Sequence, residues 1–561
     1  MHGEDPVAWQ EWSPATLALA RSENKLLFVS IGYFSCHWCH VMQAESYRNA
    51  DIAALVNGNF IPVKVDREID VALDAEMIAF AQRTRGSAGW PLNVFITPEG
   101  FPLYATLYEK PESFKEILNT LAREWQADSA GLKLMAKNSV KQAPAKQKIK
   151  LTARLAETYR NQLVHEMLAQ ADFMSGGLNV PRKFPIAPQL TALLEIEERH
   201  HDAKLTEWLR LTLDHMLNGG LRDHLAGGFF RYTIDPLWQR PHFEKMLYDN
   251  AQLAMVYMRA AKVFNHLEYR DIAMETLDFM LRDMHREGAF ITSISALDEK
   301  GQEGGTYLWS EEQLKAVLDD DEYSLVSRIW GMNTPAELDA GYLPMNVNIP
   351  AVEDIKRLKM IYPKLLQLRM QRTSPKDTKL LAGLNGMALE AFSEAAALAP
   401  RYRLAADELR GFMLSKLSQN DELFKGISRQ QLLGQGDLES YAYTAAGLMK
   451  YSQLDGNSAD TKTVQKILNV AWQKFHTPQG FLMEQGSELG RPYYQAVIED
   501  GPLPSPSSVL IKTSLLAADK GLRLKAGNAL ADGDDLQKRD LFWISTQVIA
   551  LKRYYEKKSM P

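Results

Sequence analysis

Two cysteines separated by two residues are the side chains of this sequence best suited to covalent chemistry. Cys36 and Cys39 are the only cysteines among the 561 residues, so neither thiol has another partner within the chain. In such a pair the first cysteine attacks a disulfide as a thiolate, and the second attacks the resulting mixed disulfide and releases the product. His37 and Trp38 stand between them, and His37 can add a local positive charge. The spacing therefore predicts a redox-active pair, with Cys36 as nucleophile and Cys39 as resolving thiol.

Two other roles fit the same residues. The potential zinc ligands of this stretch are Cys36, His37, Cys39 and His40. Structural zinc sites generally take a second ligand pair from a distant part of the chain, and the sequence holds no third cysteine. A vestigial or purely structural cysteine pair is the other alternative. Because the pair lies between a strand and a helix, redox chemistry is favoured over both, and we expect neither a metal nor a cofactor.

The elements around the pair must present it at the start of a helix. Residues 25–31 (KLLFVSI) form an apolar run of strand length, and a helical pattern begins at His37 after a short turn. A helix N-terminus has free N–H groups and the positive end of the helix dipole, which stabilise a thiolate at Cys36. We therefore expect Cys36 in the first turn of a helix, with its sulfur more exposed than that of Cys39.

The dipeptide Trp90-Pro91 supplies the second part of the predicted site. It directly precedes the strand expected at 92–97 (LNVFIT), and it stands where thioredoxin-like folds place a cis-proline beside their cysteines. The peptide bond before a proline is the one that adopts the cis form at low cost. We expect a cis bond that lies against the cysteine pair, so that His37, Trp38, Trp90 and Pro91 support the redox site.

Strand and helix signals alternate over residues 25–126. After the first strand and helix come a strand, a helix, two strands joined by a turn and a closing helix, at 60–65, 71–83, 92–97, 101–107 and 111–126. This order predicts an α/β domain over residues 1–130, with a mixed sheet and helices on its faces. Residues 133–150 carry six lysines and no acidic residue, so we interpret 131–150 as an exposed, Lys-rich linker.

Long helical patterns follow one another from residue 151 onward. Glycines followed by an aromatic or aliphatic residue, at 176–178, 227–229 and 288–290, recur about 50 to 60 residues apart, which is the length of a helix pair with its loop. About six such pairs would fill 151–561. The repeat predicts an all-α domain, either a closed toroid of helix pairs or an open solenoid. In a toroid the functional groups would lie on the loops at one end.

Composition and charge exclude several classes of protein. The chain is 46% hydrophobic and 24% charged, as in ordinary globular proteins. A net charge of −6 gives no basic field for a nucleic acid. The longest apolar run is about nine residues, from Leu26 to Phe34, which is too short to cross a membrane. No signal peptide is visible in the sequence as given, and the compartment stays open between a cytoplasmic protein and a periplasmic one from which an N-terminal leader has been removed.

Five stretches of the sequence resemble one known family. They are GYFSCHWCHVM at 32–42, VKVDRE at 63–68, GWPLNVFITP at 89–98, GGFFRY at 227–232 and PHFEKMLYDNAQ at 241–252. They resemble the DUF255 family of thioredoxin-domain proteins, and the resemblance covers nearly the whole chain. It implies a thioredoxin-like N-terminal domain joined to an (α/α)6 barrel, similar to those of N-acylglucosamine 2-epimerases and six-hairpin glycosidases. The family usually has two aspartates before a Gly-x-Glu-Gly turn. Here Asp298 stands at the second position and Ala296 at the first.

Polar residues near the expected hairpin loops are candidates for a second site in the barrel. Glycosyl transfer needs a pair of acids, and epimerisation needs an acid–base pair, often with histidine. The candidates are His224, Trp238, His242, Glu244, Asp249, Asp298, Glu303, Asp377 and Glu439. If they form a site, we expect them to converge at one end of the ring. Their alternative role is structural, because buried loop backbone groups also need hydrogen-bond partners.

Three hypotheses of function follow from these residues. The first is a thiol–disulfide oxidoreductase that uses Cys36 and Cys39, with a barrel that binds or presents a disulfide or thiol substrate, such as a protein. The second is a carbohydrate-modifying enzyme, an isomerase or a glycosidase, with its site in the barrel. The third is a non-catalytic protein that binds a partner. None of the three involves a nucleic acid or a membrane span.

Overall fold

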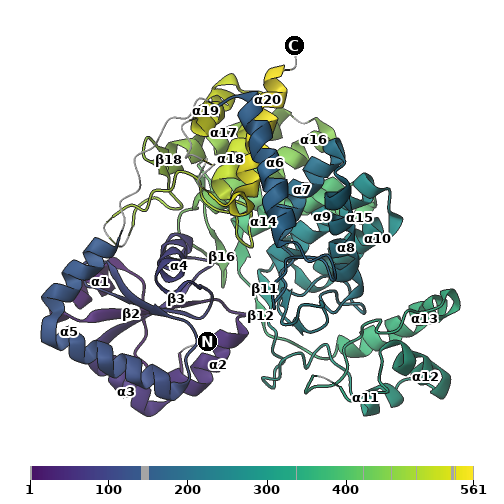
Figure 1. The fold of residues 1–561 in the computed structure, drawn as a ribbon, viewed down its shortest axis with the longest axis horizontal. Coiled ribbons are helices and arrows are strands. Elements are labelled where there is room, and N and C mark those ends of the chain that lie inside the picture. Colours follow the sequence, from purple (N-terminus) through teal and green to yellow (C-terminus); the bar gives the residue numbers. More distant parts are fainter. Residues whose placement is uncertain are drawn as a thin grey trace. The chain divides into compact units, whose positions relative to one another are not determined.

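The chain folds into two compact units (Figure 1). The computed structural model describes residues 3–140, 151–336, 338–420, 422–456, 458–487, 489, 491–531, 536 and 539–559. Met1–Ala145 and Lys474–Gln495 form the first unit, here called the thioredoxin-like unit. Lys146–Gln473 and Ala496–Pro561 form the second, the barrel unit.

A five-stranded mixed sheet forms the centre of the thioredoxin-like unit. Its strand order is β1-β3-β2-β4-β5, with β1 at Gln10–Glu11, β2 at Leu26–Gly32, β3 at Phe60–Asp66, β4 at Leu92–Ile96 and β5 at Pro102–Thr106. Strand β3 runs parallel to β1 and β2, whereas β4 runs antiparallel to β2 and β5. The predicted α/β domain with a mixed sheet is confirmed.

Helices cover both faces of this sheet because successive side chains of β2 point to opposite sides. Leu27, Val29 and Ile31 pack with residues of α1 (Pro14–Glu23) and α4 (Val71–Arg85). Leu26 and Phe28 pack with residues of the opposite face. The elements on that face are α2 (His37–Met42), the π-helix η1 (Gln43–Tyr47), α3 (Ala50–Asn59) and α5 (Pro111–Ser139). An apolar strand between two helical layers is thus what the run KLLFVSI encodes.

A segment from much later in the chain, residues 474–495, completes the thioredoxin-like unit. The sequence assigns 474–495 to the barrel domain, but Leu489 is only 5% exposed and belongs to the apolar core formed by β2, β4 and α4. The guanidinium of Arg491 forms an ion pair with Glu76 of α4. The periodicity of the sequence gives no sign of this long-range packing.

The predicted linker at 131–150 is only partly described. Helix α5 continues through Ser139, so the first residues of this range are helical. Residues 141–150 lie outside the described part of the chain.

Six helices of the barrel unit form a closed inner ring. Along the chain they are α7 (Ala187–His200), α9 (Leu247–Phe264), α14 (Ala382–Ala395), α16 (Leu438–Asp455), α18 (Pro506–Leu516) and α20 (Ser545–Ser559). Each of them packs against the next, and α20 packs against α7. The ring is therefore closed, and the open solenoid is excluded.

Six further helices alternate with these along the chain and form the outer layer. They are α6 (Ala153–Gln170), α8 (Ala203–Asn218), α10 (Leu267–Phe279), α15 (Pro400–Lys416), α17 (Ser458–Phe475) and α19 (Lys520–Ala531). The strict alternation of inner and outer helices makes this unit an (α/α)6 barrel, as predicted. It also makes the inner helices parallel to one another, so every connection from an outer to an inner helix lies at the same end of the ring.

Glycines allow the inner helices α14 and α16 to come into close contact. A Cβ atom on Gly386 would lie 2.5 Å from the backbone of Tyr443, and one on Gly447 would overlap the carbonyl oxygen of Gly386. Larger residues at these two positions would force the helices apart.

Short elements occupy the connections into the inner helices. The strands are β6 (Tyr232–Thr233), β7 (Pro241–His242), β8 (Lys245–Met246), β9 (His285–Arg286), β10 (Ala289–Phe290), β11 (Ser293–Ile294), β12 (Lys376–Asp377), β13 (Leu380–Leu381), β14 (Ser418–Gln419), β15 (Glu422–Leu423), β16 (Gly426–Ser428), β17 (Gln431–Leu432), β18 (His476–Thr477) and β19 (Gly480–Phe481). The connection between α10 and α14 also contains the π-helix η2 (Met280–Met284) and the helices α11 (Glu311–Lys315), α12 (Asp320–Ile329) and α13 (Val352–Arg369), which have an apolar core of their own. The 3-10 helix η4 (Leu541–Ile544) precedes α20.

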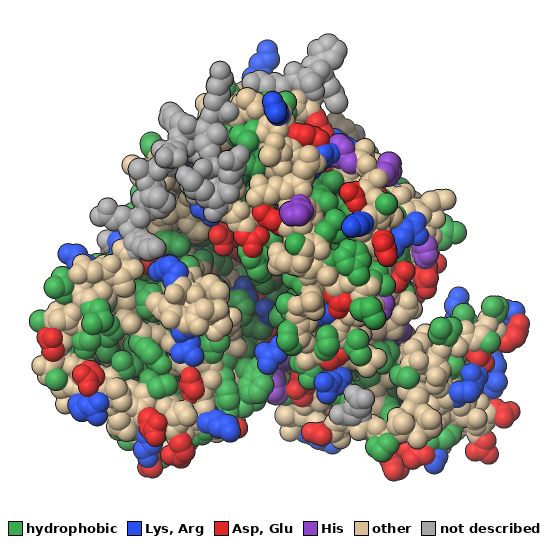
Figure 2. All heavy atoms as spheres, in the orientation of Figure 1, with side chains coloured by type: hydrophobic (Ala, Val, Ile, Leu, Met, Phe, Trp, Pro, Cys, Tyr) green, Lys and Arg blue, Asp and Glu red, His purple; other side chains and the backbone are tan. Residues whose placement is uncertain are grey.

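The charged side chains of the surface are of both signs, as the nearly balanced charge of the sequence implies. On the face drawn in Figure 2, Lys and Arg side chains are interspersed with Asp and Glu side chains. Among the described helices, none has the length and apolarity needed to cross a bilayer.

Candidate functional site

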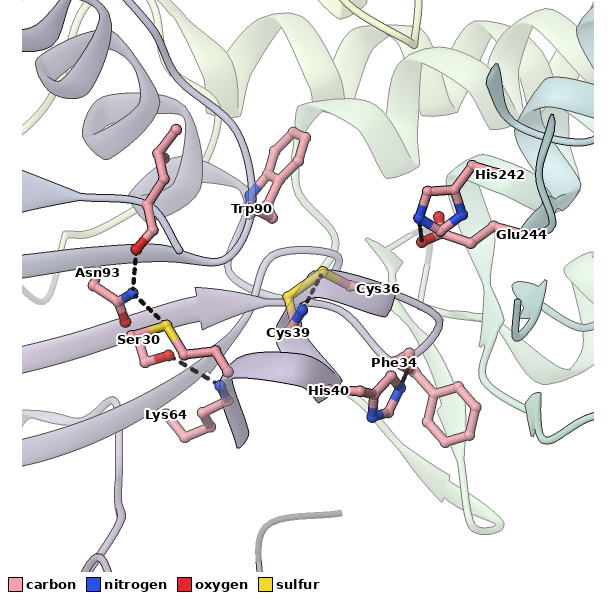
Figure 3. Close-up of a disulfide and its surroundings, with 12 residues drawn as sticks. Ser30, Phe34, Cys36, Cys39, His40, Lys64, Trp90, Asn93, His242 and Glu244 are labelled. Atoms are coloured by element: carbon pink, nitrogen blue, oxygen red, sulfur yellow. Dashed lines mark hydrogen bonds and ion pairs between the residues drawn. A yellow bond between two sulfur atoms is a disulfide. The ribbon is translucent and has the colours of Figure 1, made fainter. Parts of the chain in front are cut away.

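The two cysteines lie at the start of helix α2 and are joined by a disulfide bond (Figure 3). Cys36 is the N-cap residue of α2, and its sulfur accepts a hydrogen bond of 3.2 Å from the backbone N–H of Cys39. This contact is the one that would stabilise a thiolate on Cys36 after reduction. Cys36 as a residue is 2% exposed and Cys39 6%. Both residues are buried in this disulfide-bonded form, and the greater exposure of the Cys36 sulfur stays a prediction.

The end of strand β2 places the second sulfur. Gly32 is the last residue of β2, and a Cβ atom there would lie only 2.8 Å from the sulfur of Cys39. The carbonyl of Gly32 accepts a hydrogen bond of 2.9 Å from the backbone N–H of Arg67. Glycine at this position therefore gives the resolving sulfur the room that it occupies.

The bond between Trp90 and Pro91 is cis, as predicted. The register pairs Leu92 of β4 with Ile31 of β2, so the cis bond lies beside the end of β2 from which the cysteine loop departs. Figure 3 shows the indole of Trp90 at the same end of the sheet as the disulfide.

Trp90 is fixed by charged neighbours. Its indole N–H donates a hydrogen bond of 2.8 Å to Asp74, and the guanidinium of Arg67 lies 4.0 Å from the ring centroid. Arg67 and Asp74 also form an ion pair at 3.5 Å, and the edge of Tyr33 packs on the indole at 5.9 Å. The side chain of Trp90 is thus held in place before any substrate arrives.

The two residues between the cysteines differ in their setting. Trp38 is 40% exposed and packs on Tyr108 with ring centroids 5.0 Å apart. The His37 ring packs edge-on against Trp38 at 5.6 Å. Trp38 therefore offers an apolar surface directly beside the disulfide.

A row of polar side chains crosses the sheet, and the sequence analysis did not single it out. Lys64, Ser30 and Asn93 are paired in register on β3, β2 and β4. The Lys64 ammonium donates to the Ser30 hydroxyl at 3.0 Å, and the Tyr47 hydroxyl lies 2.9 Å from that of Ser30 and donates to Asn93 at 2.8 Å. Asn93 in turn donates to the sulfur of Met42 in α2 at 3.2 Å. The signal in the sequence was a single polar residue inside each of three apolar strands.

Lys64 is the charged member of this row. Burial lowers the pKa of its ammonium to about 8, although the nearby charges of Asp5 and Asp66 act in the opposite direction. Burial also raises the pKa of Tyr47, so its phenol stays protonated. The row thus connects one titratable cation on β3, through Ser30, Tyr47 and Asn93, to Met42 of the helix that carries the cysteines.

Five of the barrel candidates lie where connections enter inner helices. His242 and Glu244 directly precede α9, and Asp249 lies in its first turn, while Asp377 precedes α14 and Glu439 lies in the first turn of α16. Because the inner helices are parallel, these positions share one end of the ring.

Three other candidates are held by backbone groups. The ring of His224 lies 2.8 Å from the carbonyl oxygen of Gly219, and burial lowers the pKa of this histidine to about 4. The indole of Trp238 is fully buried and donates to the carbonyl of Ser175 at 2.9 Å. The carboxylate of Asp298 accepts two backbone N–H bonds within its own turn, from Lys300 and Gln302. These contacts favour a structural role for the three residues.

Asp377 is also engaged within its own connection. It accepts hydrogen bonds from the ammonium of Lys379 at 2.6 Å and from the backbone N–H of the same residue at 3.2 Å. Its carboxylate is therefore neutralised by a neighbour two residues along the chain.

Three of the remaining candidates, His242, Glu244 and Glu303, form one connected cluster. The Nδ1 of His242 lies 3.5 Å from the carboxylate of Glu303, and its Nε2 lies 3.8 Å from that of Glu244. Glu244 forms an ion pair of 3.0 Å with Arg231, both of them buried. Arg231 lies in the stretch GGFFRY, and its pairing with Glu244 depends on long-range packing that the sequence pattern does not predict.

A second buried cluster of charged side chains consists of Asp223, Lys245 and Arg369, and its role is structural. Lys245 donates to Asp223 at 2.6 Å, and Arg369 donates to both oxygens of the same carboxylate at 2.8 and 2.7 Å. All three side chains are almost completely buried. They fix the connection before α9 to the end of α13.

A separate cavity of about 410 Å³ in the barrel unit has no predicted site residue in its lining. It lies between the end of α8 and the loop after α12, and its lining includes His215, Asn218, Gln239, Trp330 and Tyr342. Among the described residues, no group of three or more His, Cys, Asp or Glu side chains is arranged to hold a metal ion.

Comparison with known proteins supports the recognised family and adds homology along most of the chain. Residues 1–143 match a family model described as "Protein of unknown function, DUF255". The human spermatogenesis-associated protein 20 is 29% identical, with 91% of this chain and 73% of the relative covered. An uncharacterized protein of Caenorhabditis elegans is 26% identical, with 91% of this chain and 77% of the relative covered.

Solved structures similar to this chain are distant in sequence. Cellobiose 2-epimerase from Spirochaeta thermophila is 13% identical at a TM-score of 0.48, and 72% of this chain and 99% of that chain are covered. A D-mannose isomerase is 9% identical at a TM-score of 0.46, with 72% and 100% covered.

Proposed function

We propose that this homologue of spermatogenesis-associated protein 20, with its DUF255 N-terminal domain, is a thiol–disulfide oxidoreductase that uses Cys36 and Cys39. One observation carries the proposal: Cys36 caps helix α2 and its sulfur accepts the backbone N–H of Cys39, at the end of the sheet that also holds the cis Trp90-Pro91 bond. A helix N-terminus and a donated N–H favour the thiolate that such chemistry requires.

The reaction needs both cysteines and transfers two electrons. In the reduced protein the Cys36 thiolate attacks one sulfur of the substrate disulfide, forming a mixed disulfide and releasing one substrate thiolate. The Cys39 thiolate then attacks the Cys36 sulfur, forms the intramolecular disulfide and releases the second substrate thiolate. Dithiothreitol or a cellular dithiol returns the pair to the reduced form, and the same steps in reverse oxidise a dithiol substrate.

The fixed indole of Trp90 and the exposed ring of Trp38 suit a protein substrate. Trp38 is exposed and Trp90 is half-buried at the disulfide, and an unfolded or extended segment around a substrate cystine can pack on this apolar surface. In this proposal the barrel binds or presents that substrate.

Insulin reduction by the full-length chain, with dithiothreitol as electron donor, tests the proposal. We expect the wild-type chain to accelerate precipitation of the insulin B chain, and the Cys36→Ser/Cys39→Ser double variant to match dithiothreitol alone. Cys39→Ser alone should accumulate a mixed disulfide with the substrate, visible by mass spectrometry. A wild-type rate equal to that of the double variant would remove the oxidoreductase function and leave a binding role for the cysteine domain.

A further inference from the structure

The cluster around His242 contains the groups of an acid–base site and belongs entirely to the barrel unit. We infer that Glu303, His242 and Glu244 form a second catalytic site, one that moves protons on a small hydroxylated carbonyl compound of the reducing-sugar class. This goes beyond the thiol chemistry, since it uses neither cysteine.

The four side chains form a chain of contacts with a charged end and an accessible end. Arg231 holds Glu244 at 3.0 Å, Glu244 faces the Nε2 of His242 at 3.8 Å, and Glu303 faces the Nδ1 of His242 at 3.5 Å. Contacts of this length shorten when a ligand fills a site, as is usual for catalytic hydrogen bonds in unliganded proteins. An imidazole that lies between two carboxyl groups can accept a proton from one of them at one ring nitrogen and donate a proton to the other from the second ring nitrogen.

Exposure assigns a role to each member. The side chain of Glu303 is 37% exposed, whereas those of His242 and Glu244 are 4% and 1% exposed. Glu303 is therefore the group that can touch a ligand. His242 and Glu244 lie behind it, where they position it and share its proton.

The protonation behaviour of Glu303 agrees with this assignment. Burial and then the charge of Glu244 raise the pKa of its carboxyl to about 7, so both its forms are populated near neutral pH. Burial lowers the pKa of His242, while Glu244 acts in the opposite direction and Arg231 and Arg182 add to the lowering. The imidazole is thus neutral where Glu303 titrates.

Aromatic rings beside the cluster indicate the class of ligand. Tyr232 packs against His242 with centroids 4.9 Å apart, and Phe184 stacks on Tyr232 at 4.5 Å. Phe184 is 44% exposed. A sugar ring presents C–H groups that pack on an aromatic face and hydroxyl groups that hydrogen-bond to carboxylates. The aromatic rings and the carboxylates of this cluster can therefore contact both kinds of group.

The step balances without an oxidant or a metal. The Glu303 carboxylate takes the proton from the carbon next to the carbonyl group, and the electron pair of that C–H bond forms the carbon–carbon double bond of an enediol. The carbonyl electrons move to oxygen, which takes a proton from water. In the return step the protonated Glu303, after exchange with solvent, gives a proton to the carbon, and the hydroxide left by the water takes the proton from the enediol oxygen. A carbonyl sugar is regenerated, with a solvent hydrogen in place of the original one.

Hydrogen exchange in D2O, followed by proton NMR on the full-length chain, measures this step directly. The probes are D-glucose, D-galactose, D-xylose and D-fructose, each observed at the carbon-bound hydrogen next to the carbonyl carbon of the open form. We expect at least one probe to lose that signal faster than in the protein-free control. Glu303→Gln should lower the rate at least 100-fold, and Glu299→Gln, an exposed carboxyl in the same connection, should leave it unchanged.

The Cys36→Ser/Cys39→Ser variant separates this site from the redox function. Exchange at the wild-type rate in that variant is the expected result, whatever the outcome of the insulin assay. Exchange that stays at the protein-free level for all four sugars overturns the inference, and so does a wild-type rate in Glu303→Gln.

Discussion

The guanidinium of Arg491 donates a hydrogen bond of 3.1 Å to the backbone carbonyl of Gly100, which lies 391 residues earlier in the chain. The same group pairs with Glu76 of α4 and lies 5.3 Å from the ring centroid of Phe101. Two residues before it, Leu489 is buried in the core behind the central sheet. The thioredoxin-like unit is therefore made from the first 145 residues and from residues 474–495, and its stability depends on a segment far along the sequence from the cysteines.

Leu489→Ala should destabilise the thioredoxin-like unit. Removal of a buried leucine side chain from a packed core costs about 2–5 kcal/mol in free energy of unfolding. Urea titration followed by tryptophan fluorescence measures the loss. Leu524→Ala is the control, since Leu524 is 65% exposed on the barrel unit, and equal stability of the two variants would show that Leu489 is not part of this core in solution.

Gly32→Ala should impair the redox pair. The added methyl group would lie 2.8 Å from the Cys39 sulfur, so either the helix or the strand must shift, at a cost of about 1–3 kcal/mol. We expect insulin reduction to fall at least tenfold. Gly58→Ala introduces the same methyl group where no atom lies within 4 Å, and its rate should equal that of the wild type. A fully active Gly32→Ala protein would contradict the packing described here.

Trp38→Ala should lower the activity toward protein disulfides and leave the activity toward small disulfides unchanged. The exposed ring of Trp38 lies between the cysteines but takes no part in bond making. We expect kcat/KM for insulin to fall about tenfold, the effect of roughly 1.4 kcal/mol of lost apolar contact. The rate with the small disulfide hydroxyethyl disulfide should be unchanged. A parallel loss with both substrates would indicate that Trp38 supports the cysteines rather than the substrate.

Lys64 should make the stability of the thioredoxin-like unit depend on pH. The pKa of its ammonium is about 8 in the folded chain and 10.5 in the unfolded one. Between these values the unfolded chain binds more protons, so the free energy of unfolding rises as the pH rises from 8. We expect a gain of about 2 kcal/mol between pH 8 and pH 10, measured by urea titration at each pH.

Lys64→Met is the control for this pH dependence. Its free energy of unfolding should be flat over the same range, because the side chain no longer titrates. A rise of equal size in Lys64→Met would assign the effect to another group.

Local patterns explain why the redox site could be predicted from the sequence. An apolar strand, a CxxC at a helix start and a Trp-Pro before the next strand are all short-range features, and together they give the N-cap position of Cys36 and the cis bond at Pro91. The helical repeat likewise predicts the helix pairs, since each pair is one local unit, but it fits a closed ring and an open solenoid equally well.

Features that depend on strand register or on long-range packing could not be predicted from the sequence. The row of Lys64, Ser30 and Asn93 exists only because three strands align at one level. Glu303 meets His242 because two separate connections enter the same end of the barrel. Polarity near a loop does not distinguish Glu303 from Asp298, whose carboxylate serves its own turn.

The parallel inner ring has an electrostatic consequence. Each helix carries the equivalent of about half a positive charge at its N-terminus, and six such termini point to the same end of the barrel. Their fields add where Glu244, Asp249, Asp377 and Glu439 are found. The helix backbones therefore add a favourable electrostatic contribution for anionic groups at this end, which acts against the burial and the charge of Glu244 that raise the pKa of Glu303.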